Sequence, residues 1–232
     1  GAQCVVIDPG PRMDAHRDAI AAAVKGREVV GIVVTHCHGD HSPLAAWLKT
    51  ETGAPTYAIG PHRTFPGFVE EDDHDPSEDE GEPELSEEEK EGLDTDFRPD
   101  ITVTDGETFL RARDFSMAAV HTPGHTSNHL CVAVPEEATL FTGDHVMGWS
   151  TTVVSPPDGD MAAYFDSLRK VAGRSDAVLR PTHGGPVTDP APFLAALLAH
   201  RTERENQVLA QLADGPRTIP EMVKVMYADV HK

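Results

Sequence analysis

Residues 35–41 read THCHGDH, a segment that holds three histidines and one aspartate within seven positions. Imidazole and carboxylate groups are ligands that zinc, manganese and iron all accept. In an extended segment alternate side chains point to the same side, so we expect His36 and His38 to share one ion. Asp40 and His41 follow the bend at the glycine and are expected to serve a second ion. The segment therefore predicts part of a site with two metal ions.

Further candidate ligands occur later in the chain, each in a short glycine-containing motif. They are His125 in HTPGHTSNH, Asp144 in FTGDH and His183 in PTHGG. Glycine lets the backbone bend closely around a site. Any one of these residues taken alone is more often a surface or core residue, because the chain has 13 histidines. Four motifs in this order, each after a predicted strand, are much harder to obtain by chance and favour a shared site.

The segment THCHGDH is expected on a loop between a strand and a helix. Residues 29–35 form a β-branched apolar run without alternation, which predicts a strand covered on both faces. Ser42 and Pro43 suit the cap and first turn of a helix that runs to about Thr50. The two elements would hold the loop from both ends.

The remaining pattern predicts an α/β layered domain with its site at one sheet edge. Residues 4–8 and 14–25 read as an opening strand and helix. Further elements are expected near residues 56–59, 101–103, 115–120, 129–134, 139–141, 160–171 and 177–180. Strands mixed with helices, with several loops converging at strand ends, are typical of such a domain.

The C-terminal part of the chain has a wholly helical pattern. One helix is expected from about residue 189, and a capping box, Thr218-Ile-Pro-Glu221, opens another. We therefore expect a first domain over residues 1–185 and a helical tail over residues 186–232.

The formal net charge of −20 is concentrated in one segment. Residues 70–100 contain 17 acidic and 2 basic residues, so the rest of the chain nets only −5. We interpret residues 70–100 as a solvated acidic insertion without chemistry of its own, in which a capping box at Ser86 is compatible with a short helix. The remaining chain offers no broad basic face for nucleic acid.

The cysteine content and the hydropathy indicate the cellular location of the protein and its relation to membranes. The three cysteines, Cys4, Cys37 and Cys131, are too few for a disulfide framework, so a reducing, cytoplasmic location is expected. No apolar run approaches the roughly 20 residues that a membrane helix needs, so we expect no membrane partner.

The ordered motifs, from IDPG at residues 7–10 to His183, resemble those of the metallo-β-lactamase superfamily. The resemblance implies an αββα four-layer sandwich with two divalent ions at its edge, zinc foremost, with manganese or iron also compatible. It assigns one ion to His36, His38 and His125, the other to Asp40, His41 and His183, and a bridging position to Asp144. A hydroxide between the ions would be the nucleophile, and Asp40 would orient it.

Several neighbouring residues are candidates for supporting roles. His121, His129 and His145 flank the ligand motifs and are weighed as general acids for the leaving group, with His129 placed first. For each of them an incidental or supporting role is the alternative. Asp8 is expected to support the site from behind, and Trp149 to line a substrate mouth.

Asp144 and the C-terminal motifs narrow the resemblance to particular branches of the superfamily. The antibiotic-cleaving members lack the bridging aspartate, so Asp144 indicates thioesterase, lactonase or nuclease branches. GDHVMGWSTTVVSPPDGDMAAYFDSL, RPTHGGPV and a tail beginning HRTEREN resemble the β-lactamase-like protein 2 group, whose tail is a winged-helix domain. Relative to that group both ends look truncated, and the tail would hold only part of a winged helix.

Three hypotheses remain open. The first is a dinuclear metal hydrolase, by resemblance an endoribonuclease-like phosphodiesterase that acts on single-stranded RNA. The second is a glyoxalase-II-like hydrolase of a small thioester or lactone. The third is not an enzyme but a winged-helix interaction module with a structural metal site. Substrate, metal identity and oligomeric state are open at this point.

Overall fold

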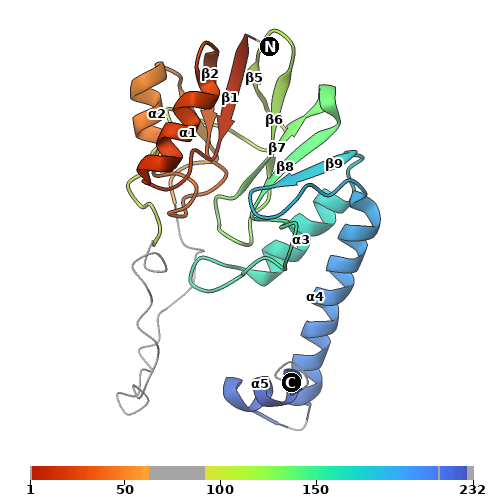
Figure 1. Cartoon of the computed structure of the whole chain (residues 1–232). Coiled ribbons are helices and arrows are strands. Elements are labelled where there is room, and N and C mark those ends of the chain that lie inside the picture. Colours follow the sequence, from red (N-terminus) through yellow and green to blue (C-terminus); the bar gives the residue numbers. More distant parts are fainter. Residues whose placement is uncertain (1, 63–91, 214, 229–232) are drawn as a thin grey trace, which may run out of the picture. The chain divides into compact units, whose positions relative to one another are not determined.

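The computed structural model describes residues 2–62, 92–213 and 215–228. The chain divides into two compact units, Gly1–Pro190 and Ala191–Lys232. In the first unit two β-sheets face each other, with α1 and α2 on the outer face of one sheet and α3 on the outer face of the other (Figure 1). This is the four-layer αββα arrangement that the family resemblance of the motifs implies.

The first sheet is parallel and has the strand order β1-β2-β3-β4. Parallel neighbours need crossover connections, and α1 and α2 supply the first two. The bounds are β1 Gln3–Ile7, α1 Asp14–Val24, β2 Glu28–Val33, α2 Ala45–Thr52, β3 Thr56–Ala58 and β4 Ile101–Thr102. The N-cap residue of α2 is Leu44, two residues after the predicted cap Ser42.

The second sheet has the order β5-β6-β7-β8-β9 and is antiparallel except for the β8–β9 pair. The sequence did not predict β5, because its four residues carry only two adjacent apolar side chains. The bounds are β5 Thr108–Arg111, β6 Ser116–His121, β7 Leu130–Val134, β8 Thr139–Gly143, α3 Met161–Ala172 and β9 Val178–Pro181, with a 3₁₀ turn over Pro135–Glu137 between β7 and β8.

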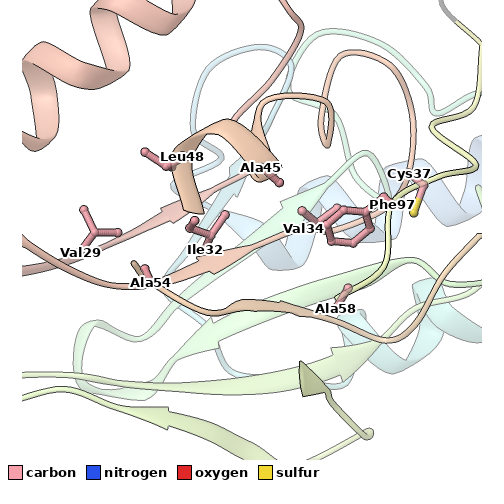
Figure 2. Packing of buried hydrophobic residues seen from close by; sticks show 9 residues of the cluster. All are labelled: Val29, Ile32, Val34, Cys37, Ala45, Leu48, Ala54, Ala58 and Phe97. Carbon is pink, nitrogen blue, oxygen red and sulfur yellow. The ribbon is translucent and has the colours of Figure 1, made fainter. Parts of the chain in front are cut away.

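Two apolar clusters hold the layers together. One lies between the first sheet and α2 (Figure 2) and contains Val29, Ile32, Val34, Cys37, Ala45, Leu48, Ala54, Ala58 and Phe97. The other lies between the sheets and contains Val33, Tyr57, Val103, Leu110, Met117, Ala119, Leu130, Val132 and Val134. Full burial of the valine, leucine, isoleucine, methionine and phenylalanine side chains among them contributes about 1.5–3 kcal/mol each. Since Ile32, Val33 and Val34 are fully buried, the prediction of a strand covered on both faces is confirmed.

Gly124 brings the loop between β6 and β7 against the backbone of α3. Its φ is +140°, and a Cβ at this position would lie 2.3 Å from Cα of Tyr164. Asp160 donates its backbone N–H to the Gly124 carbonyl at 2.8 Å, and its side chain caps α3 by accepting the N–H of Ala163. The loop that carries His125 is thereby attached to the first turn of α3.

The C-terminal end of the acidic segment is held to the body. Residues 70–91 and the expected cap at Ser86 lie outside the described residues. Asp94 accepts a hydrogen bond from Ser42 Oγ at 2.6 Å and donates its N–H to the Cys37 carbonyl at 2.7 Å. Phe97 is buried in the cluster of Figure 2. The interpretation of residues 70–100 as one solvated insertion is therefore wrong for Asp94 and Phe97, because Asp94 is hydrogen-bonded to the loop before α2 and Phe97 is buried in an apolar cluster.

The second unit contains most of α4, Pro190–Leu212, and α5, Ile219–Met226. The capping box that opens α5 is confirmed, since Thr218 and Glu221 exchange both hydrogen bonds. Arg204 of α4 donates to the Met226 carbonyl at 3.3 Å and lies over the Tyr227 ring. Among the described helices none is both long and apolar enough to cross a membrane.

Replacing Gly124 with alanine is expected to destabilise the protein by several kcal/mol, because the new methyl group would overlap backbone atoms that cannot rotate away. Gly53→Ala is the matched control, since its φ of +73° is strained but no atom lies within 4 Å of the position that a Cβ would take. It should cost only about 1–2 kcal/mol. Urea unfolding followed by circular dichroism measures both, and equal costs would contradict the close contact with α3.

Candidate metal centre

The structure brings all seven predicted ligand residues together at one edge of the two sheets. His36, His38, Asp40 and His41 lie on the loop between β2 and α2, and the others lie on loops that follow strands of the second sheet. Within the described residues, ligand atoms that lie within 4.8 Å of one another form three groups, namely His36, His38 and His125; His36, His41 and Asp144; and Asp40, His41 and His183. His36 and His41 each belong to two of these groups, so the seven residues form one continuous cluster of candidate ligands.

Three imidazole nitrogens converge in the first group. His36 Nε2 lies 2.9 Å from His38 Nδ1 and 3.2 Å from His125 Nε2, and the latter two atoms are 3.1 Å apart. Ligands bound tetrahedrally to zinc at about 2.0–2.1 Å lie roughly 3.3 Å from one another. The spacing therefore fits a small cation bound by all three nitrogens.

The positions of the ring protons support this fit. His125 Nδ1 is 2.7 Å from the Val153 carbonyl, which can only accept, so His125 carries its proton there and leaves Nε2 bare. Thr35 donates its hydroxyl to Asp8, so it accepts from His36 Nδ1 at 3.0 Å, and His36 Nε2 is bare as well. Two lone pairs thus face each other at 3.2 Å, an arrangement that a bound cation stabilises.

The third group contains one carboxylate, Asp40, beside the imidazoles of His41 and His183. His183 Nε2 is 3.0 Å from an Asp40 oxygen, and His41 Nε2 is 3.4 Å from the other Asp40 oxygen. Asp144 lies between this third group and the first, with Oδ2 at 3.5 Å from His183 Nε2 and 3.9 Å from His125 Nε2. This is the arrangement expected of a bridging carboxylate.

Buried atoms without a hydrogen-bond partner provide a further test of fit. In the described part of the chain these include His41 Nε2 and Asp144 Oδ1, which are 3.5 Å apart. Unpaired buried polar atoms are costly and call for a physical explanation. A divalent ion between the histidine nitrogen and the carboxylate oxygen would supply the missing partner, so the donors present fit the implied ions.

Asp8 holds the cluster from behind, as the sequence analysis expected. Its carboxylate accepts the Thr35 N–H at 2.7 Å, the Thr35 hydroxyl at 2.8 Å and His41 Nδ1 at 3.0 Å. His41 Nε2 is therefore directed towards Asp40 and Asp144. Sequence reasoning assigned no role to Thr35 or Thr182, although both directly precede a ligand histidine; Thr182 also donates to Asp8, at 3.4 Å.

Burial and mutual repulsion keep the first group of imidazoles neutral. Burial lowers the pKa of His36 well below its ordinary value, and the neighbouring imidazoles lower it further. The same two causes lower the pKa of His38 to about 4. Burial also lowers the pKa of His125. Neutral imidazole is the form that binds a metal ion.

His41 and the carboxylates around it have the opposite electrostatics. Burial opposes protonation of His41, but the charges of Asp8, Asp144 and Asp40 raise its pKa well above the ordinary value. Although burial would raise the pKa of Asp144, the neighbouring, positively charged imidazole of His41 lowers it. Without an ion, the positive charge of protonated His41 balances the negative charge of these carboxylates. A metal ion bound to His41 Nε2 would replace that proton and supply the positive charge.

The histidines weighed as general acids are turned away from solvent or otherwise engaged. His129 is fully buried, its Nε2 accepts the backbone N–H of Asp144 at 3.2 Å, and burial lowers its pKa well below the ordinary value. His145 is also fully buried. His121 contacts the Ser127 carbonyl through Nε2 at 3.1 Å. The geometry thus argues against His129 as the leaving-group acid, because its acceptor nitrogen supports Asp144 instead.

Cys37, which lies between two candidate ligands in the sequence, packs in the apolar cluster of Figure 2. It is fully buried among apolar residues, and its sulfur accepts a hydrogen bond from Asn128 Nδ2 at 3.3 Å. Burial raises the pKa of the thiol to about 11.

Replacing Asp8 with asparagine is expected to weaken zinc binding by about 10- to 100-fold. Asparagine tolerates the positive φ of 51° at this position, but its amide N–H₂ would face the donors on Thr35 and His41. Competition with a chromogenic chelator measures the affinity. Asp14→Asn, at an exposed carboxylate of α1, makes the same charge change and should bind zinc like the unaltered protein; an equal loss in both variants would contradict the role of Asp8.

Known proteins with similar sequences include thioesterases and lactamase-like proteins. An atrochrysone carboxyl ACP thioesterase from Emericella nidulans is 29% identical over 214 residues, which cover 91% of this chain and 58% of that protein. The lactamase-like protein notP from Aspergillus sp. (strain MF297-2) is 26% identical, over 99% of this chain and 64% of that protein. The chain thus spans less than two thirds of the length of these relatives.

Solved structures share the fold. A metallo-beta-lactamase family protein from Thermus thermophilus matches with a TM-score of 0.72 and 26% identity, over 96% of this chain and 78% of that one. The protein TTHA1623, solved in a di-iron-bound form, matches with a TM-score of 0.54 and 25% identity, over 84% and 86%. The family model described as the metallo-beta-lactamase superfamily matches residues 1–183. The span of that match, which includes all seven convergent donors, shows that this chain belongs to the metallo-beta-lactamase superfamily.

Proposed function

We propose that this chain is the catalytic part of a metal-dependent hydrolase that cleaves thioesters. The observation that carries the proposal is the convergence of seven imidazole and carboxylate donors that share His36 and His41 between overlapping groups. The names of relatives such as the atrochrysone carboxyl ACP thioesterase support the thioester as the substrate class. A thioester carried by an acyl carrier protein, or a small-molecule thioester, fits this class.

The donors would hold two divalent ions. His36, His38 and His125 would bind one, Asp40, His41 and His183 the other, and Asp144 would contact both. Zinc is the first candidate, and the nitrogen and oxygen donors suit manganese and iron as well; the di-iron form of TTHA1623 is in keeping with iron. When bound, such ions lower the pKa of water towards neutrality and polarise the carbonyl group under attack.

The exposure of the donors favours catalysis over a structural role. Structural zinc sites are closed and use four ligands. The side chains of Asp40 and His183 are 45% and 31% exposed, so this side of the cluster is open to substrate. An interaction module with a structural metal, the non-enzymatic alternative, would not need seven donors or an open side.

Asp40 is the residue we assign to handling the attacking water. Although burial opposes ionisation, the neighbouring, positively charged imidazole of His41 lowers the pKa of Asp40. Its carboxylate oxygens therefore remain acceptors near neutral pH. Being exposed, they would accept a hydrogen bond from the attacking water and orient it towards the carbonyl carbon.

The leaving group favours a thioester over an RNA phosphodiester. A thiol has a pKa of about 8.5, so a thiolate leaves near neutral pH without a strong acid. The alkoxide expelled from a phosphodiester is far more basic and needs a proton donor. His129 and His145, both weighed as that donor, are fully buried and have lowered pKa values. The endoribonuclease hypothesis, placed first from the sequence, is therefore the less supported one.

The tail contributes little to a choice of substrate. We assign the hydrolytic chemistry to residues 1–185 and leave residues 186–232 outside it. A winged helix needs strands as well as helices, and the described part of the tail holds only α4 and α5. The relatives with thioesterase names likewise give no specific support to the β-lactamase-like protein 2 group.

Zinc-loaded protein is expected to hydrolyse an acyl-N-acetylcysteamine thioester, with release of thiol measured by a chromogenic reagent. Removal of a residue that only supports a metal ligand lowers kcat/KM by up to about 100-fold. Asp144→Ala should lower kcat/KM by more than this, because the Asp144 carboxylate itself would contact both ions. Asp166→Ala, at an exposed position of α3, is the control and should retain activity.

Labelled single-stranded RNA and a simple lactone are assayed in parallel, with Asp40→Ala as the control for contaminating hydrolases. Cleavage of RNA by the unaltered protein but not by Asp40→Ala, together with no thioester turnover, would overturn the proposal. The metal content of each preparation is measured, so a loss of ions is not mistaken for a loss of chemistry.

A further inference from the structure

Trp149 is a large apolar side chain left in solvent beside the cluster. It is 73% exposed, and the chain has only one other tryptophan, Trp47, which packs against the cluster of Figure 2. The Trp149 ring lies 6.4 Å from the His183 ring, centroid to centroid, with an angle of 6° between the planes. A parallel geometry at this distance is within the range of offset stacking. The Trp149 indole therefore lies beside a candidate metal ligand and keeps most of its surface exposed to solvent.

The position of Trp149 is set by direct contact between two loops. Gly148 donates its N–H to the His183 carbonyl at 2.8 Å. A Cβ on Gly148 would lie 2.3 Å from the Gly185 carbonyl oxygen, and a Cβ on Gly184 would lie 2.8 Å from Gly148 Cα. Side chains are thus excluded where the loops meet, and the backbone next to Trp149 is braced against the His183 loop. Such bracing lowers the entropy lost when a ligand binds.

The same loop reaches the other side of the cluster. The Thr152 hydroxyl donates to the Asp144 carbonyl at 2.7 Å, and the Val153 carbonyl accepts from His125 Nδ1 at 2.7 Å. The Val153 side chain is nevertheless 66% exposed. Residues 149–153 therefore run along the rim of the cluster, attached to it through the backbone and Thr152, with two apolar side chains turned to solvent.

We propose that Trp149 determines substrate specificity by stacking against a planar, apolar acyl group of the thioester. The assignment rests on the proposed thioester function. A flat indole face favours a flat, polarizable partner over a flexible arm that carries polar amides. Residues 147–157 contain no charged side chain, so the rim offers no cation to a polyanion such as RNA. The acyl group would lie on Trp149 with its carbonyl group directed towards the cluster.

Binding can be tested without turnover. Trp47→Phe leaves Trp149 as the only indole, so its fluorescence reports contact at the rim. The probes are two thioethers of N-acetylcysteamine that cannot be hydrolysed, one with a phenacyl group and one with an acetonyl group. We expect the phenacyl compound to quench the emission and shift it to shorter wavelength, and the acetonyl compound to leave it unchanged.

Selectivity provides the second measurement. Replacing Trp149 with alanine should lower the ratio of kcat/KM for benzoyl over acetyl thioesters on the order of tenfold, and Trp149→Phe should restore part of it. Trp47→Phe, remote from the rim, should leave the ratio unchanged. Zinc content is compared between variants, since a lost ion would lower both rates and leave the ratio intact.

The outcomes separate this proposal from the thioester function. Thioester turnover with an unchanged ratio and no quenching would overturn the role of Trp149 and leave the function standing. Quenching by the phenacyl compound without turnover of either thioester would support the stacking surface and refute the function. Quenching by a single-stranded oligoribonucleotide, and not by the phenacyl compound, would overturn the acyl assignment in favour of a stacked base.

Discussion

The candidate site depends on the hydrogen-bond acceptors that lie behind its imidazoles. An imidazole that turns one bare nitrogen inwards has to donate from the other nitrogen. The Val153 carbonyl, the Thr35 hydroxyl and the Asp8 carboxylate accept these protons from His125, His36 and His41. Since all three acceptors lie outside the cluster, the inner nitrogens are left without protons or directed at carboxylates. This outer set of hydrogen bonds therefore orients the imidazoles of the candidate ligands towards one another.

Asp8 connects this outer set to the fold itself. It follows β1, accepts from Thr35 at the end of β2 and receives a longer bond from Thr182 after β9. Its carboxylate thus joins both sheets at the edge where the ligand loops meet. Because the sheets pack through a common apolar cluster, their spacing sets the distance between loops that are far apart in the sequence. The buried core therefore fixes the geometry of a polar, partly open site.

The sequence by itself predicted the seven side chains that meet at one edge of the sheets, and the order of most strands and helices in the first unit. It could do so because metal ligands must be particular residue types, and because buried strands require continuous apolar runs such as residues 29–34. It did not determine which nearby histidine touches solvent. His129 was placed first as an acid, and only the tertiary structure turned its Nε2 towards the Asp144 backbone.

Tertiary structure also decided features that leave little local pattern. The strand β5 has only Phe109 and Leu110 as apolar residues and forms because β6 pairs with it. Asp94 and Phe97 belong to an acidic stretch that composition marks as solvated, yet Ser42, the Cys37 carbonyl and an apolar cluster hold them. Thr35, Thr182 and the Val153 carbonyl acquire their roles from distant partners. Composition and spacing report what a residue can do, whereas a hydrogen bond between remote segments exists only after the sheets have packed.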